Sequence, residues 1–167
     1  KDHLKWGYGS FATNILDANV PSYPHLKFRL YPKPWIKFEY IHASLQSNII
    51  DSTSVYQVGN GMHDRYEFHN KYLASNLLSL RLQRKTWFSL GNSIVYSQDN
   101  IEPAYLIPLA FYKSIDHYIA DRNNYRGGNA QMFAAISTRV IPKLHIYSTL
   151  FVDEVSMRRM FDKAAHS

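Results

Sequence analysis

Cysteine is absent from the 167 residues, so disulfides, cysteine-based zinc sites and thiol catalysis are excluded within this chain. Glycine and proline are scarce, with seven of each, which excludes collagen-like and low-complexity sequence. No run of about 18 apolar residues occurs, and a membrane-spanning helix is therefore excluded as well. The formal charge is +6, but the 19 basic residues are scattered along the chain. This scatter argues against nucleic acid as a partner.

Hydrophobic residues make up 46% of the chain and aromatic residues 15%, which is too much for a disordered protein. The length fits one domain, which we take to span residues 1–167. The sequence begins at Lys1, without an initiator methionine or an apolar leader. We therefore expect either that a leader has been removed or that the chain is a segment of a longer protein.

Alternation of apolar and polar residues dominates the sequence and predicts long β-strands. Their expected length is about 9 to 12 residues, against a mean of about 5 to 6 in soluble proteins. The hairpins are expected at residues 26–45, 71–97 and 129–155, with turns at Pro32-Lys33-Pro34, Arg84-Lys85 and Pro142-Lys143.

Short turns alternate with two long loops, at residues 47–70 and 98–128. Short turns at one end and long loops at the other are typical of outer-membrane β-barrels. One face of each expected strand is apolar, whereas the other carries Ser, Thr, Asn, Gln and His. The pattern predicts an all-β, antiparallel meander that forms part of a transmembrane outer-membrane β-barrel with a partly helical long loop. A soluble antiparallel sandwich with one solvated face is the alternative. Aromatic residues near strand ends resemble the girdles of a barrel: Tyr31, Trp35, Tyr72, Trp87 and Tyr96.

The loop at residues 98–128 contains a helical pattern. Glu102-Pro103 predicts the start of a helix, because proline is favoured at the first helical position. The residues expected to share one helical face are Tyr105, Leu109, Tyr112 and Ile119. The glycines at 127 and 128 predict its end.

Catalytic signatures are absent from the sequence, and neither a cofactor nor a metal is expected. A metal site at His63, Asp64, Glu67 and His69 is conceivable, but a solvated polar loop explains these residues better. Paired carboxylates for glycoside cleavage, chosen from Glu102, Asp116 and Asp121, are a further reading with less support.

The long loop is better suited to binding, because aromatic rings lie among polar side chains there. Such rings can lie against sugar faces, while amides and carboxylates bind the hydroxyl groups. The alternative is that the rings plug the loop into a barrel mouth and bind nothing. The candidates for glycan binding or for the plug are Glu102, Tyr105, Tyr112, Lys113, His117, Tyr118, Asp121, Arg122 and Asn123.

Four sequence blocks occur in an order that is typical of one protein family. They are Gly7-Tyr8-Gly9 with Pro21-Ser22-Tyr23-Pro24; Lys71-Tyr72-Leu73-Ala74; Ile101-Glu102-Pro103-Ala104-Tyr105-Leu106-Ile107-Pro108 with Asp121-Arg122-Asn123-Asn124; and Leu144-His145-Ile146-Tyr147 with Leu150-Phe151-Val152-Asp153-Glu154. In these blocks the chain resembles the Wzi-like capsule assembly family of outer-membrane proteins, in its Bacteroidetes branch. The third and fourth blocks are the most specific.

The resemblance implies a large outer-membrane barrel that tethers or organises capsular polysaccharide. We expect a non-enzymatic protein of the Gram-negative outer membrane that binds or tethers surface or capsular polysaccharide and supports capsule assembly. Its partners would be that polysaccharide, outer-membrane lipid and other envelope proteins. The strands expected here are fewer than the eight of the smallest bacterial barrels, so this segment would not close alone.

Two alternatives to this function stay open. The first is a scaffold or channel component of an export or gliding assembly, without affinity for sugar. The second is a soluble β-sandwich enzyme that acts on glycans through Glu102 and Asp121.

Overall fold

The computed structural model describes residues 4–9, 13, 15–17, 22–45, 47–51, 56–58, 63–98, 100–123 and 128–153, with side chains for all of these except 56–58, 63–65, 122 and 123. The elements are β1 (His25–Lys33), β2 (Ile36–Leu45), β3 (Tyr56–Val58), β4 (His63–Arg65), β5 (Lys71–Gln83), β6 (Thr86–Tyr96), η1 (Pro103–Leu106), α1 (Tyr112–Asn123), β7 (Asn129–Thr138) and β8 (Ile146–Asp153).

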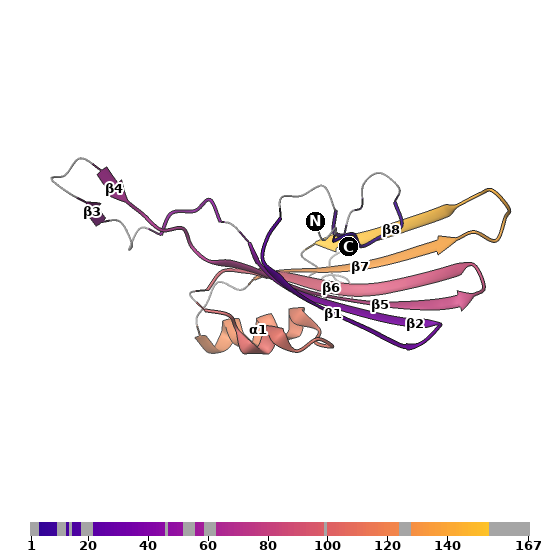
Figure 1. Cartoon of the computed structure of the whole chain (residues 1–167). Coiled ribbons are helices and arrows are strands. Elements are labelled where there is room, and N and C mark those ends of the chain that lie inside the picture. The colour runs from indigo at the N-terminus through magenta and orange to yellow at the C-terminus, as the bar shows by residue number, and fades with distance from the viewer. Residues whose placement is uncertain are drawn as a thin grey trace, which may run out of the picture.

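Six strands form one antiparallel sheet in the order β1-β2-β5-β6-β7-β8 (Figure 1). Each strand therefore pairs with its neighbour in the chain, apart from the small β3–β4 hairpin inserted between β2 and β5. The three predicted hairpins and the all-β meander are confirmed, although the third hairpin is closed by residues 139–145 and not by a tight turn at Pro142-Lys143 alone. The β3–β4 hairpin was not predicted, since three-residue strands carry too little alternation to be recognised.

Apart from the register shifts next to Lys33 and Gln83, the pairing places the even-numbered residues of the six strands on one face of the sheet. For example, Phe38 pairs with Leu78, and Leu78 with Leu90. The ladder continues from Leu90 to Ala134 and then to Leu150. We call this side the helix face, because α1 packs on part of it, and the odd-numbered side the cleft face. Figure 1 shows α1 on one side of the sheet and the N-terminal segment on the other.

The long loop holds two short helical elements rather than the single helix that the sequence predicts. Pro108 has no N–H to donate and keeps Ile107 out of the α conformation (φ −75°, ψ 112°), so η1 ends there. Leu109 consequently lies between η1 and α1 and is 81% exposed, so its predicted place on the same helical face as Tyr105, Tyr112 and Ile119 is wrong. Tyr105, Tyr112 and Ile119 are buried in the core cluster on this side of the sheet.

Each face of the sheet has its own core. On the helix face, α1 and η1 cover the end of the strands next to the long loops; the buried residues there are Phe38, Tyr40, Ala74, Ile94, Tyr96, Tyr105, Tyr112, Ile119 and Ala130. On the cleft face, the N-terminal segment covers a second cluster of Leu4, Trp6, Ile41, Ala43, Leu73, Leu77 and Phe133.

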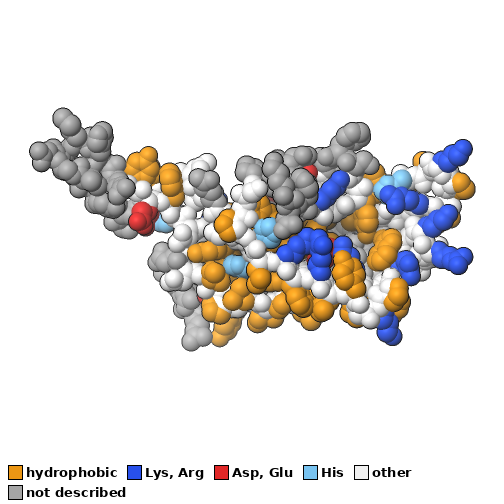
Figure 2. Space-filling view, in the orientation of Figure 1, with side chains coloured by type: hydrophobic (Ala, Val, Ile, Leu, Met, Phe, Trp, Pro, Cys, Tyr) orange, Lys and Arg blue, Asp and Glu red, His pale blue; other side chains and the backbone are white. Residues whose placement is uncertain are grey.

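The remainder of the helix face carries exposed apolar side chains, which we call the apolar belt. Its members are at least 38% exposed and come from five of the six strands of the sheet: Leu26, Phe28, Leu30, Leu78, Leu90, Ile136 and Leu150. Contiguous apolar patches of this kind mark a surface that another apolar layer covers. Hydrophobic side chains also gather along the lower side of the molecule in Figure 2.

Gly91 allows the ring of Phe133 to lie against β6 at the centre of the sheet. The two residues pair directly across β6 and β7, and a Cβ at position 91 would lie 2.9 Å from Cζ of Phe133 and closer still to the carbonyl oxygen of Asn76. Because the obstructing atoms include backbone, the contact cannot be relieved by a change of rotamer alone.

We expect Gly91→Ala to lower the free energy of unfolding by about 1 to 3 kcal/mol, through overpacking. Urea unfolding in detergent followed by circular dichroism measures the change. Ser148→Ala, at an exposed site on β8, is the control and should be near neutral. Equal stability of the two variants would contradict this account of the glycine.

Candidate functional site

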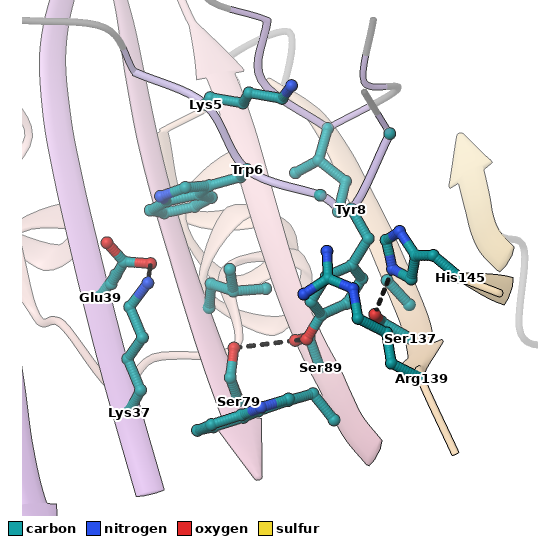
Figure 3. Close-up of a pocket in the computed structure, with 16 residues that line it drawn as sticks. Lys5, Trp6, Tyr8, Lys37, Glu39, Ser79, Ser89, Ser137, Arg139 and His145 are labelled. Atoms are coloured by element: carbon teal, nitrogen blue, oxygen red, sulfur yellow. Dashed lines mark hydrogen bonds and ion pairs between the residues drawn. The ribbon is translucent and has the colours of Figure 1, made fainter. Parts of the chain in front are cut away.

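A concave polar site lies on the cleft face, beneath the N-terminal segment. Trp6 anchors this segment, since it pairs with Leu16 through two backbone hydrogen bonds and is 1% exposed. The cleft has a volume of about 530 Å³. Its polar and charged lining comes from the segment and from β2, β5, β6 and β7, with the following β7–β8 connection, as Figure 3 shows: Lys5, Tyr8, Lys37, Glu39, Ser79, Ser89, Ser137, Arg139 and His145.

Hydroxyl groups form the floor of the cleft. The hydroxyls of Tyr8 and Ser89 are 2.8 Å apart, and those of Ser89 and Ser79 are also 2.8 Å apart (Figure 3). Alongside this chain, the Ser137 hydroxyl lies 2.8 Å from Nε2 of His145, which fixes the imidazole ring. Ser79, Ser89 and Ser137 occupy odd positions of the neighbouring strands β5, β6 and β7, which is why residues far apart in the sequence meet here.

Positive charge surrounds Glu39, the single carboxylate among the described residues that line the cleft. Glu39 is 2% exposed, and three cations approach its side chain. Lys37 lies 2.7 Å away, Arg29 2.8 Å and Lys27 3.9 Å. A buried carboxylate needs such partners, because an unpaired one would be too costly to desolvate. The cations outnumber the carboxylate, so this part of the cleft face keeps a net positive charge.

The long loop packs on the opposite face, where it is tied to the sheet by two asparagines. The Nδ2 of Asn76 donates to the carbonyl oxygens of Pro108 (2.9 Å) and Ala110 (2.8 Å). Asn92 donates to Oδ1 of Asn76 (2.8 Å), and its own Oδ1 accepts from the backbone N–H of Tyr112 (2.9 Å). The pair thus satisfies backbone groups at the start of α1 that would otherwise be buried without partners.

Two aromatic candidates from the sequence are inside this packing. Tyr105 and Tyr112 are 0% exposed, so neither ring is open to a ligand in this arrangement. Tyr105 donates to Oδ1 of the buried Asp116 at 3.0 Å, and the N–H of Gly128 donates to the same oxygen. Burial raises the pKa of the Tyr112 hydroxyl, which therefore stays protonated. The carboxylate and the rings fasten α1 to the sheet.

Three other candidates come together on the outer side of α1. His117, Tyr118 and Asp121 are exposed; Tyr118 is 65% exposed, and Nε2 of His117 lies 3.7 Å from Oδ2 of Asp121. Glu102 is half-buried and caps η1 by accepting from the N–H of Ala104 at 3.3 Å. Lys113 is half-buried on α1, and the side chains of Arg122 and Asn123 lie outside the described residues.

The cleft itself was not predicted. Gly7-Tyr8-Gly9 and His145 entered the sequence analysis only in the blocks that carry the family resemblance, and Arg139 was not singled out. The available signal was the odd-numbered polar register of β5, β6 and β7. It could not be used from the sequence alone, since it does not show which segment covers that face.

Other potential sites add little. Among the side chains that the structure describes, no group of three or more His, Asp or Glu could hold a metal ion. The conceivable metal site includes His63 and Asp64, whose side chains are outside that set. No described helix is long and apolar enough to cross a membrane.

Comparisons with protein-family models, with curated proteins and with solved structures find no match to this chain.

The asparagine pair generates a prediction about the loop. We expect Asn76→Ala to lower the free energy of unfolding by about 1 to 3 kcal/mol, because the carbonyl of Pro108 loses its donor and that of Ala110 keeps only the 3.3 Å bond from Nδ2 of Asn92. Amide hydrogen exchange should rise in residues 107–116 and not in β6.

Asn100→Ala is the matched control, since Asn100 is exposed in the same loop. Unchanged exchange in the Asn76 variant would show that the aromatic contacts alone hold the loop.

Proposed function

We propose that the chain forms part of the wall of an outer-membrane β-barrel, of the Wzi-like type, that binds or tethers surface or capsular polysaccharide and supports capsule assembly. The proposal contains no catalytic step. The observation that carries it is the apolar belt, which lies on one face of a sheet whose opposite face is polar and charged. Lipid outside and a polar interior are the two environments that such a sheet fits.

The dimensions of the sheet support lipid as the cover. β5 has 13 residues and β6 has 11, and about 9 to 11 residues suffice to cross a bilayer on a tilted strand. The β1–β2 and β5–β6 strand pairs each close with a two-residue turn, whereas the connections at the other end are long. A second protein sheet would have to share the helix face with α1 and η1, which already occupy its loop end.

Side chains at the turn end fit the boundary between hydrocarbon and water. Tyr31 is 61% exposed and Trp35 is 45% exposed, and Nζ of Lys33 lies 5.9 Å from the centre of the Trp35 ring. Aromatic and long basic side chains are favoured at this depth. Figure 2 shows Lys and Arg gathered at this end of the molecule.

Six strands do not close a bacterial barrel, because the smallest have eight. β1 and β8 each have an outer edge without a neighbour among the described strands. An open edge in hydrocarbon leaves backbone groups unpaired at several kcal/mol each. The proposed wall therefore includes strands beyond the described sheet, from other protein segments or other copies.

The scaffold or channel alternative draws on the burial of Tyr105 and Tyr112. These rings hold the loop to the sheet, so a purely structural role explains them without a ligand. The enzyme alternative requires Glu102 and Asp121 as an acid and a base. Glu102 instead caps η1 and Asp121 lies beside His117, contacts that serve the helical elements themselves.

Leu90→Arg tests the lipid cover. Leu90 is 48% exposed in the belt and Leu109 is 81% exposed in the loop, so arginine at either site is tolerated in water. In a bilayer, only Leu90→Arg puts a charge in hydrocarbon, which costs about 2 to 4 kcal/mol near the midplane. We expect Leu90→Arg to reduce the folded protein in the outer-membrane fraction, and Leu109→Arg to leave it unchanged. Recovery of both variants as soluble monomers without detergent would contradict the proposal that the sheet forms part of a membrane barrel.

The exposed side of α1 tests the polysaccharide contact of the long loop. We expect Tyr118→Ala to weaken retention of surface polysaccharide in a pull-down by several-fold, since an exposed ring is lost. Ser114→Ala, exposed on the same helix, is the control. Unchanged retention in Tyr118→Ala would favour the scaffold role for this loop.

A further inference from the structure

The cleft face carries more basic groups than the buried carboxylate of Glu39 can neutralise. Glu39 already has Lys37, Arg29 and Lys27 around it. Arg139 lies elsewhere in the cleft, and none of the ion pairs found among the described residues includes its guanidinium group. Figure 3 shows this group among Tyr8, Ser89 and His145. Arg139 is exposed, so its guanidinium group is open to an anion that enters this end of the cleft.

Hydroxyl and imidazole groups surround the same space. Ser79, Ser89 and Tyr8 form a chain of hydroxyls that can each donate and accept, and His145 is oriented by Ser137. This density of small polar donors, with a guanidinium at one end, suits a ligand that carries several hydroxyls and one negative group. A simple inorganic anion would leave most of these groups unused.

Aromatic surface is present beside the polar groups. Trp87 lines the cleft, and Cζ of Arg81 lies 5.8 Å from the centre of its ring. Trp6 also lines the cleft, and its indole nitrogen is buried without a hydrogen-bond partner in the described structure, on the side of Glu39 in Figure 3. Trp6 and Trp87 therefore provide aromatic surface beside the hydroxyl groups, against which a sugar ring can pack.

We propose that this cleft is a binding site for an acidic sugar unit, with a carboxylate that pairs with Arg139 and hydroxyls that hydrogen-bond to Ser79, Ser89 and His145. The guanidinium fork matches a carboxylate, and the pair is stronger than a neutral hydrogen bond. The volume of about 530 Å³ lies within the range of small-molecule sites. This inference rests on the proposed polysaccharide function and moves the contact from the loop at residues 98–128 to the opposite face.

The test uses the full chain in detergent micelles and its tryptophan fluorescence, since Trp6 and Trp87 both line the cleft. The probes are an oligogalacturonate, a neutral maltooligosaccharide of equal length and inorganic phosphate. We expect the oligogalacturonate to bind at least tenfold more tightly than either of the others, and its affinity to fall as salt is raised.

Arg139→Gln is expected to weaken oligogalacturonate binding about tenfold or more, and Arg139→Lys to restore part of it. Arg84→Gln is the matched control, because Arg84 is exposed in the β5–β6 turn and does not line this cleft. It should change the affinity less than twofold. Unchanged circular dichroism in each variant keeps a folding defect apart from a binding defect.

Several results would overturn the inference. Equal binding of acidic and neutral sugars, equal effects of Arg139→Gln and Arg84→Gln, or phosphate as tight as the uronate would each do so. Retention of surface polysaccharide together with no binding of oligogalacturonate would reject the acidic subsite alone. If the unmodified chain does not retain surface polysaccharide in the pull-down, the proposed function itself is rejected.

Discussion

The antiparallel register of β2, β5, β6 and β7, which is regular up to the irregularity between Arg81 and Gln83, is the constraint on which the other features depend. Because successive side chains point to opposite faces, a slip of one residue would exchange the two faces of the sheet. Leu78 and Leu90 would then replace Ser79 and Ser89 beneath the N-terminal segment. Register is fixed by the two-residue turn at Arg84-Lys85 and by the Gly91–Phe133 contact. The belt and the cleft are therefore two consequences of a single alignment.

Much of the sheet could be predicted from the sequence, since alternation over 10 or more residues is a strong local signal. The alternation of Leu78, Leu80 and Leu82 with polar residues located β5, and the pattern after Trp87 located β6. The single long helix was wrong because Pro108 interrupts it, an effect that a pattern of apolar spacing does not include. The strands of the β3–β4 hairpin have three residues each, which is too short for alternation to be recognised.

The site was harder to predict than the strands, because it depends on which segment covers which face. Tyr105 and Tyr118 lie in one aromatic-rich loop, yet one is wholly buried and the other is 65% exposed. The hydrogen bonds from Asn76 and Asn92 to the loop backbone set which side of the loop faces the sheet, and the sequence does not reveal these bonds. The polar residues of the cleft come from five separated stretches of chain, so no local motif could reveal them. The odd-numbered positions of those on β2, β5, β6 and β7 become informative once the strands are aligned.

The position of α1 has a consequence for how deeply the sheet could sit in a bilayer. The helix lies on the same face of the sheet as the apolar belt. Within the proposed barrel wall it would therefore project from the outer surface of the barrel. Its exposed side bears His117 and Asp121, which favour water over hydrocarbon. The strand ends beneath it, including Tyr72 and Tyr96, would be kept above the acyl chains. A surface loop would in this way set the depth of immersion from outside the wall, rather than obstruct a passage through it.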